Sequence, residues 1–379
     1  MKHFFFYYLC LAFLLQACGV RGGNHEPIRP GQLWLDDRGV HINAHGGGVL
    51  YHKGTYYWYG EYKSDSTSKA LVGITCYSSS NLTDWKNEGI ALPVADNDTT
   101  SDIAKGCIME RPKVIYNKQT GKFVMWFHLE LKGRGYGPAR AAVAVSDSPT
   151  GPYCFIRSAR VNSSIYPLNM TKKEKRIKWN LSEYEKWWTP EWYDAVEKGM
   201  FVKRDLEGGQ MSRDMTLFVD DDGKAYHIFA SETNSTIHIA ELTDDFLDYT
   251  GKYVRAFVNR YMEAPAIFKK DGLYYFMGSG CTGWKPNAAR SAVAPSIWGP
   301  WTELGNPCQG ENSETTFHSQ STYILPVSGR KNVFIYIGDR WNPQNAIDGR
   351  YIWLPIDFQD NRFNIHWHNE WDLKYFDCK

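Results

Sequence analysis

The stretch Tyr261-Met262-Glu263-Ala264-Pro265-Ala266-Ile267-Phe268 places a single carboxylate, Glu263, at the start of a short apolar run. The turn Lys270-Asp271-Gly272 follows it, and the aromatic run Leu273-Tyr274-Tyr275-Phe276 comes next. This pattern predicts a strand, a tight turn and a second strand. A lone carboxylate at a strand end is usually solvated, so Glu263 becomes a candidate for function only if the pattern recurs.

Four other segments have the same layout: a polar residue, an apolar strand, a turn glycine and an aromatic strand. The polar residue stands nine positions before the turn glycine in the units that begin at His45, Asp214, Glu263 and Gln320, and eleven positions before it in the unit that begins at Glu110. Five hairpins that share one polar position indicate an internal repeat. Further strands such as residues 141–145 and 237–240 complete units of about four antiparallel strands.

Four-stranded units repeated around an axis form a β-propeller, so we expect an all-β, five-bladed fold. The first strand of a blade lies nearest the axis, and the five polar residues should therefore converge at one end of the central channel. Residues 160–210 interrupt the repeat between the second and third units. Thr189 followed by Pro190 is a good helix start, which predicts a largely helical insertion, either at the pocket mouth or packed on the side. Its basic run, residues 172–176, is expected to be solvated.

The N-terminus has the features of a targeting segment. Residues 4–15 form an apolar run after a short basic start, and Leu15-Gln16-Ala17-Cys18-Gly19 resembles the end of a bacterial lipoprotein signal. We expect residues 1–17 to be a signal peptide, Cys18 to be lipidated, residues 18–30 to be a tether, and residues 31–379 to be the propeller. Ordinary signal-peptidase cleavage nearby is the alternative. The protein is then expected in the bacterial cell envelope, in the periplasm or on the outer-membrane surface, with the N-terminal lipid as its only membrane contact.

Composition excludes some partners and favours others. A formal net charge of +1 without a long basic run argues against a nucleic-acid partner. Aromatic residues make up 15% of the chain, which suits strands, and exposed aromatics suit the apolar faces of sugar rings. Besides Cys10 and Cys18 there are six cysteines, none in a metal-binding spacing, and their pairing stays open. We expect a monomer that requires no cofactor or metal; a structural calcium or a water near His45 remains open, although a lone histidine more often belongs to the core.

The converging residues suit glycoside hydrolysis, which uses one protonated acid and a second group that activates water. Glu263 and Asp214, on adjacent units, suit the roles of acid and of a neighbour that tunes its pKa. The aromatics Trp284, Trp341 and Tyr136 are candidate sugar platforms, with core packing as the alternative for each. His45 is a candidate substrate contact because it occupies the shared position.

Three motifs within the five units, Ser212-Arg213-Asp214-Met215, Glu263-Ala264-Pro265 and Ile42-Asn43-Ala44-His45-Gly46-Gly47-Gly48, together resemble family 43 glycoside hydrolases. The resemblance covers roughly residues 30–375 and is greatest to the exo-β-1,3-galactanase branch. It implies a five-bladed propeller and an inverting exo-hydrolase of plant-type galactan or arabinogalactan. It also implies that Glu263 is the general acid, that Asp214 modulates its pKa and orients it, and that Glu61 accepts a substrate hydroxyl.

The identity of the base departs from the family pattern. Most members place an aspartate on the first strand of the first blade, but that strand begins here with Ala44-His45-Gly46 and has no carboxylate. The galactanase branch shares this lack, and there Glu110 and Gln320 match the candidates for holding the attacking water. A neutral amide is a very poor base, so Gln320 would position water, act as an imidic-acid tautomer or need help from a carboxylate. On physical grounds we favour Glu110.

Two other functions fit the same residues. An α-L-arabinofuranosidase or a β-galactosidase of the family is the first alternative, because a fold does not fix the sugar. A non-catalytic sugar-binding propeller is the second, and the missing aspartate favours it. The presence of both Glu263 and Asp214 at the shared position argues against it, since pure binding needs no protonated acid.

Overall fold

The computed structural model describes residues 26–64 and 67–377. The predicted signal peptide, Cys18 and most of the predicted tether therefore lie outside the described residues, and their predictions are untested. No helix in the described part of the chain is long and apolar enough to cross a bilayer. Cys76, Cys107, Cys154, Cys281 and Cys308 are free thiols.

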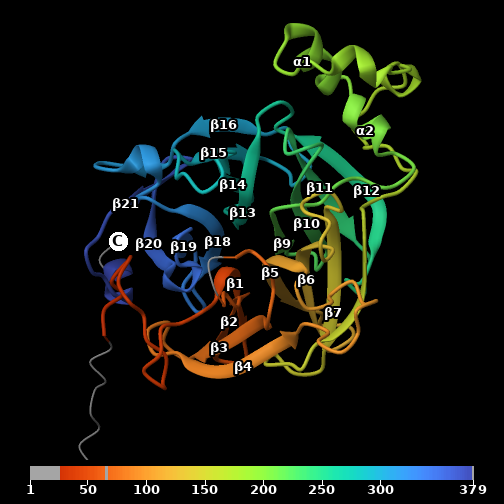
Figure 1. Cartoon of the computed structure of the whole chain (residues 1–379). Helices are drawn as coiled ribbons and strands as arrows, with labels where there is room; N and C mark the ends of the chain where they lie inside the picture. Colours follow the sequence, from red (N-terminus) through yellow and green to blue (C-terminus); the bar gives the residue numbers. More distant parts are fainter. Residues whose placement is uncertain (1–25, 65–66, 378–379) are drawn as a thin grey trace, which may run out of the picture.

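Five sheets stand around a central axis, which confirms the predicted five-bladed propeller (Figure 1). Blade one contains β1 (His45–His52), β2 (Thr55–Glu61), β3 (Gly73–Ser79) and β4 (Lys86–Pro93). Blade two contains β5 (Ile108–Tyr116), β6 (Phe123–Glu130), β7 (Arg140–Ser146) and β8 (Cys154–Ala159). Blade three contains β9 (Met215–Val219), β10 (Ala225–Ser231), β11 (Thr236–Leu242) and β12 (Tyr249–Ala256). Blade four contains β13 (Met262–Lys270), β14 (Leu273–Gly280), β15 (Arg290–Ala294) and β16 (Thr302–Gly305).

Blade five has an extra strand and joins the two ends of the described chain. Its strands are β18 (Gln320–Pro326), β19 (Phe334–Arg340), β20 (Arg350–Gln359) and β21 (Arg362–His366), and the short β17 (Cys308–Gln309) pairs in parallel with β21. Ile28, ahead of blade one, pairs with Trp371, beyond β21, through two backbone hydrogen bonds of 2.8 and 3.0 Å. Short 3-10 helices lie at Ser313–Thr315, Ala346–Asp348 and Leu373–Phe376.

The hydrophobic core is divided among the spaces between blades. One cluster fills each of the five interfaces, and the cluster between blades five and one is the richest in tryptophan, with Trp58, Trp85, Trp353 and Trp371 buried. Burying large aromatic side chains is worth about 1.5–3 kcal/mol each, so these interfaces hold the ring closed. Most aromatics of the chain thus serve the core, and only exposed ones are available to a ligand.

The first strands of the five blades line the channel and contact one another around the ring. The turn glycine of each hairpin has a positive φ, as predicted from the repeat: Gly54, Gly121, Gly223, Gly272 and Gly329. That conformation is available to glycine at little cost, which explains why each unit places glycine there.

The insertion between blades two and three carries four short helices joined by irregular chain. They are the 3-10 helices Glu174–Arg176 and Leu181–Tyr184, α1 (Pro190–Glu197) and α2 (Met200–Arg204). The Thr189 side chain accepts a hydrogen bond from the Trp192 amide at 3.2 Å, as expected of the predicted helix start. The insertion projects from the rim of the propeller beside blades three and four (Figure 1).

A buried ion pair fixes the insertion to blade three. Arg255, on β12, donates to the Val196 and Glu197 carbonyls at the end of α1, at 2.6 and 2.7 Å. The same guanidinium pairs with Glu232 at 2.6 and 2.8 Å, and both side chains are buried. Because a buried arginine needs all of its donors satisfied, this arrangement holds α1 in one orientation.

Candidate active site

One end of the channel holds a pocket of about 290 Å³ that gathers the predicted polar residues. Eight of the nine predicted catalytic and substrate-binding residues line it: Glu61, Glu110, Tyr136, Asp214, Glu263, Trp284, Gln320 and Trp341. Lys63, Ser68, Arg111 and Gly283 complete the wall. The shared position of the repeat therefore does mark one site, although His45 is not among the residues that line it.

A β-bulge follows the shared polar residue in several blades. The strand register shifts between His45 and Gly48, between Glu110 and Lys113, and between Glu263 and Ala266. In each case the next residue has a positive φ: 61° at Gly46, 55° at Arg111 and 53° at Ala264. Such bulges bend a strand and redirect a side chain, which explains how residues of inner strands come to face the channel mouth.

Glu263 is a half-buried carboxyl group with the properties of an acid. Asn234 Nδ2 donates to Glu263 Oε1 at 2.8 Å. Burial, and then the negative charge of Asp214, raises the pKa of Glu263 to about 7. The group therefore holds a proton in slightly acidic solution, where an ordinary glutamate is ionised.

Asp214 lies directly behind this acid and is fixed by two donors. Its Oδ2 accepts from the Ala264 amide at 3.0 Å and from Arg111 Nη2 at 2.9 Å. Because Ala264 follows Glu263 in the chain, the first contact ties the position of Asp214 to that of the acid. Asp214 is therefore fixed in position beside Glu263, and its negative charge acts on that acid.

Arg111 is the central cation of the site, and the sequence analysis did not identify it. Its Nη2 donates to Gln320 Oε1 at 2.6 Å, and its backbone amide donates to Glu61 Oε1 at 3.0 Å. The buried guanidinium also lies 5.4 Å from the centre of the Trp341 ring. One arginine thus contacts residues of blades one, three and five and offsets the repulsion among their carboxylates.

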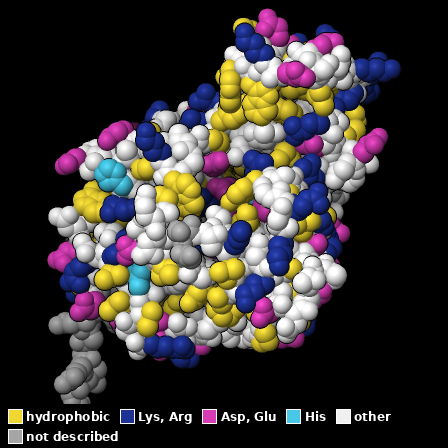
Figure 2. Space-filling model, in the orientation of Figure 1, with side chains coloured by type: hydrophobic (Ala, Val, Ile, Leu, Met, Phe, Trp, Pro, Cys, Tyr) yellow, Lys and Arg dark blue, Asp and Glu magenta, His cyan; other side chains and the backbone are white. Residues whose placement is uncertain are grey.

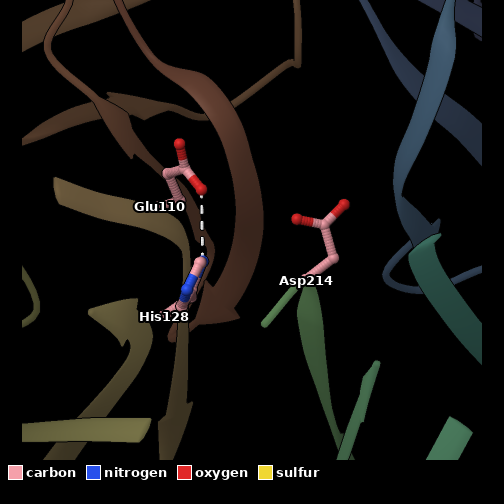
Figure 3. A group of neighbouring side chains, drawn as sticks. All are labelled: Glu110, His128 and Asp214. Atoms are coloured by element: carbon pink, nitrogen blue, oxygen red, sulfur yellow. Dashed lines mark hydrogen bonds and ion pairs between the residues drawn. The ribbon is translucent and has the colours of Figure 1, made fainter. Parts of the chain in front are cut away.

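Glu110 belongs to a separate chain of hydrogen bonds (Figure 3). Its Oε2 lies 3.1 Å from His128 Nδ1, and its Oε1 accepts from the Tyr136 hydroxyl at 2.7 Å. His128 Nε2 lies 2.9 Å from Glu130 Oε1. Burial opposes both charges, but the hydrogen bonds and mutual attraction prevail: they raise the pKa of His128 to about 9 and lower that of Glu110 to about 2. Glu110 is therefore ionised at any working pH.

Glu110, His128 and Asp214 together offer three groups of the kind that bind metals. Ligand atoms of Glu110, His128 and Asp214 lie within 4.8 Å of one another, and Figure 3 shows Asp214 at the start of a different strand from the other two. A histidine must be neutral to bind a metal, whereas both ring nitrogens of His128 are used between carboxylates and its pKa is raised. Asp214 is already paired with Arg111. The group is better explained as a charge-balanced hydrogen-bond network.

Gln320 has its amide oriented by three partners. Its Oε1 accepts from Arg111 and from Trp341 Nε1, the latter at 3.0 Å, and its Nε2 donates to Ser279 Oγ at 2.9 Å. Two strong donors at the oxygen fix which way the amide faces. The second hydrogen on Nε2 is then the group that Gln320 can offer to a water molecule.

Glu61 and Lys63 form a buried ion pair at the pocket wall, with Lys63 Nζ 2.5 Å from Glu61 Oε2. A Cβ atom at Gly46 would stand 2.2 Å from Glu61 Oε1, so this position of the Ala44-His45-Gly46 segment needs glycine. Asn43 fixes Lys63 by two hydrogen bonds of 2.8 Å with its backbone. The motif around residue 45 therefore shapes the wall instead of supplying a carboxylate.

The aromatic candidates differ in their exposure. Tyr136 and Trp284 are 41% and 48% exposed and are free to meet a sugar, whereas Trp341 is half-buried and lies edge to face with Trp284 at 5.9 Å. His45 is fully buried behind this wall, stacked 5.3 Å from Tyr351 and 6.2 Å from Trp341. Two aromatic rings therefore flank His45.

Comparisons with known proteins agree on one family. Residues 186–352 match the model of glycosyl hydrolases family 43. A solved family 43 β-1,3-galactosidase with bound galactodeoxynojirimycin is 61% identical, with a TM-score of 0.90 and coverage of 91% of this chain and 100% of that chain. The exo-β-1,3-galactanase of Clostridium thermocellum is 36% identical, with a TM-score of 0.73 and coverage of 91% and 66%.

A curated relative is similar over a shorter region. The β-D-galactofuranosidase of Aspergillus niger is 30% identical over 129 residues, which are 31% of this chain and 37% of that protein. This chain thus spans just under two thirds of the Clostridium thermocellum enzyme and matches little more than a third of the Aspergillus niger enzyme.

Proposed function

The chain belongs to the glycosyl hydrolases family 43, and from that premise we propose that it is an inverting exo-β-1,3-galactanase. The observation that carries the proposal is the pair formed by Glu263 and Asp214, in which a half-buried acid with a pKa raised to about 7 stands against a fixed anion. The solved relatives at 61% and 36% identity are named for activity on β-1,3-linked galactose. A pure binding protein would have no use for a carboxyl group kept protonated.

We assign the leaving-group proton to Glu263. As the glycosidic bond breaks, the oxygen of the leaving sugar takes the proton of this carboxyl group. Negative charge then appears beside Asp214, and Asn234 donates to the new carboxylate. Positive charge develops on the galactose ring at the same time, and the surrounding anions Asp214, Glu110 and Glu61 favour it.

We assign water activation to Glu110, with Gln320 holding the water. Water that attacks an oxocarbenium-like centre becomes strongly acidic as the new bond forms, so even a carboxylate with a pKa of about 2 can accept its proton. The oxygen of Gln320 already accepts from Arg111 and Trp341, which leaves an N–H group for the water oxygen. Gln320 can therefore orient the nucleophile but is poorly placed to take its proton.

The shape of the pocket supports attack at a chain end. A volume of about 290 Å³ stands at the lower limit of small-molecule sites, roughly 300–1,000 Å³. It suits one sugar unit, with Trp284, Trp341, Glu61 and Lys63 among the residues of its wall. A pocket of that size favours release of single galactose units over cleavage within a polymer.

The substrate is tested by a product profile. The purified enzyme is expected to release galactose from β-1,3-galactan and from arabinogalactan, and the product should first appear as the α-anomer by NMR. Aryl α-L-arabinofuranosides and aryl β-D-galactofuranosides are the comparison substrates. Hydrolysis of the arabinofuranoside or the galactofuranoside, without release of galactose from β-1,3-galactan, would assign the protein to another activity of the family. Saturable binding without any product would make it a binding protein.

We propose in addition that the enzyme is exported and anchored through Cys18. The proposal rests on the sequence pattern Leu15-Gln16-Ala17-Cys18-Gly19. The full-length chain, expressed in a bacterial host, is expected to incorporate labelled palmitate and to sediment with membranes, and the Cys18→Ala chain should do neither. Labelling of the Cys18→Ala chain, or a soluble unlabelled wild type, would refute the anchor.

A further inference from the structure

A second, larger cleft adjoins the active site on the far side of the general acid. Its volume is about 810 Å³, well within the range of ligand sites. The lining comes from blade three, blade four and the insertion, and includes Trp187, Trp188, Asn234, Tyr261, Cys281 and Arg290. None of the functions proposed above uses this cleft.

Asn234 and Cys281 connect the cleft to the chemistry. Asn234 donates to Glu263 Oε1 at 2.8 Å, and the Cys281 thiol lies beside the same carboxyl group. Both residues line the cleft. A general acid must touch the oxygen that joins the cleaved sugar to its leaving group. A galactan chain held by Glu263 therefore leaves the small pocket past these two residues and enters the cleft.

Two exposed tryptophans of the insertion form the outer wall. Trp187 and Trp188 are 40% and 56% exposed, although tryptophan is among the side chains that gain most from burial. Trp188 lies 4.8 Å from Tyr261 and 5.2 Å from the buried Trp192, so its ring is supported from behind. Figure 2 shows hydrophobic side chains gathered on the insertion, above the hollow in which acidic side chains are visible.

Trp188 is also held in an unfavourable backbone conformation. Its φ is 70°, in the left-handed region, where a bulky residue is uncommon. The residue directly precedes Thr189, which caps α1, and the end of α1 is fixed by Arg255. The fold therefore maintains both a strained backbone and an exposed ring at this position, a combination that indicates function.

The polar groups of the cleft are suited to sugar hydroxyls. Arg260 pairs with Glu303 at 2.7 Å, which offsets its charge, and Arg290 donates to the Arg260 carbonyl. Asn287 and Thr282 add neutral donors and acceptors. Flat aromatic rings beside neutral donors and acceptors suit the apolar faces and the hydroxyl groups of a sugar chain.

We propose that this cleft binds the leaving-group side of a linear β-1,3-galactan, with Trp188 as a stacking platform for a sugar beyond the bond that is cleaved. The inference rests on the proposed function, because it takes the chain direction from Glu263. It makes the insertion a specificity element: kcat/KM rises with chain length because longer substrates reach the tryptophans, whereas a disaccharide does not.

The test compares chain lengths in the Trp188→Ala and Trp187→Ala variants. For Trp188→Ala, kcat/KM on β-1,3-galactotetraose is expected to fall about tenfold, and kcat/KM on β-1,3-galactobiose less than twofold. Trp367→Ala is the matched control, because Trp367 is 37% exposed and does not line the cleft. An equal fall on both substrates, or no fall on the tetrasaccharide, would overturn the proposal.

A binding measurement separates this inference from the proposed reaction. With Glu263→Gln as background, the affinity for β-1,3-galactotetraose is measured by calorimetry with and without Trp188→Ala. A Kd that rises tenfold with Trp188→Ala supports the stacking platform, and an unchanged Kd overturns it. A small difference in the stability of the variants does not alter this conclusion. If the wild type released no galactose from any β-1,3-galactoside, the proposed function would be refuted. A Kd that depends on chain length would still show whether the cleft binds a galactan chain.

Discussion

Glu263→Gln is expected to lower kcat on β-1,3-galactobiose by about a thousandfold, or roughly 4 kcal/mol of transition-state stabilisation. Glutamine fills the same space and can keep the Asn234 contact, but it has no proton to give to a sugar leaving group. A dinitrophenyl β-galactoside needs no such proton, because its leaving group is a stable anion. Turnover of that substrate should therefore fall less than tenfold, and the comparison isolates proton donation from binding.

The pH profile of the wild type should report the same group. Burial and the Asp214 charge raise the pKa of Glu263 to about 7, so its active, protonated form prevails below that pH and is lost above it. The pKa of Glu110 is lowered to about 2, so its active, ionised form persists on the acidic side. We expect kcat/KM to be level between about pH 4 and 6 and to fall tenfold per unit well above pH 7.

Protein stability provides an independent check. Because the folded-state pKa of Glu263 is raised above its unfolded value, the folded protein holds this proton more tightly, and stability is lost as pH rises through about 7. Glu263→Gln should therefore melt at a higher temperature than the wild type at pH 8 and at a similar one at pH 5. Glu241→Gln, which changes a buried carboxylate of blade three far from the reaction, is the control.

The role of Glu263 as the acid would be contradicted by its turnover. If Glu263→Gln kept more than a tenth of the wild-type turnover on galactobiose, Glu263 would not be the general acid.

The five blades were predictable because each repeat carries its own local signals. Every unit has a glycine with positive φ at its hairpin turn. A polar residue stands nine positions before that glycine in four units and eleven positions before it in the unit of Glu110. The position of the insertion was harder to predict, because Thr189 and Pro190 indicate where a helix starts but not which blade it packs against. Its attachment to blade three depends on Arg255 and Glu232, which are distant in sequence from α1 and carry no local signal.

The carboxylates of the site were predictable, whereas the groups that control them were not. Glu263, Asp214 and Glu110 share the position of the repeat. Arg111 and His128 do not occupy that position, but both are neighbours of Glu110, which does. Arg111 comes directly after Glu110 in the bulge, and His128 is the cross-strand partner of Glu110 on β6. A search for cations next to each shared residue and across from it would have found both. His45 is the opposite case: it occupies the shared position of the repeat, but it is buried behind the wall of the pocket and does not line it.

The second large effect concerns the base. Glu110→Gln is expected to lower kcat by a hundredfold or more on galactobiose and on the dinitrophenyl galactoside alike, because both need an activated water. Glutamine can still accept the Tyr136 hydrogen bond but cannot take a proton. Removing the Glu110 charge also takes away a partner that raises the pKa of His128, so that pKa should move down, which NMR titration of the ring can measure.

Gln320→Ala separates positioning of water from deprotonation. The loss of the amide frees Arg111 Nη2 and the Trp341 indole from their shared acceptor, and we expect kcat to fall roughly tenfold, by less than in Glu110→Gln. The decisive variant is Gln320→Glu. A carboxylate at this position would face Arg111 and could itself act as a base, so in the Glu110→Gln background it should restore part of the lost turnover. Near-full turnover in Glu110→Gln together with a much larger loss in Gln320→Ala would show that the amide, and not the carboxylate held by His128, activates the water.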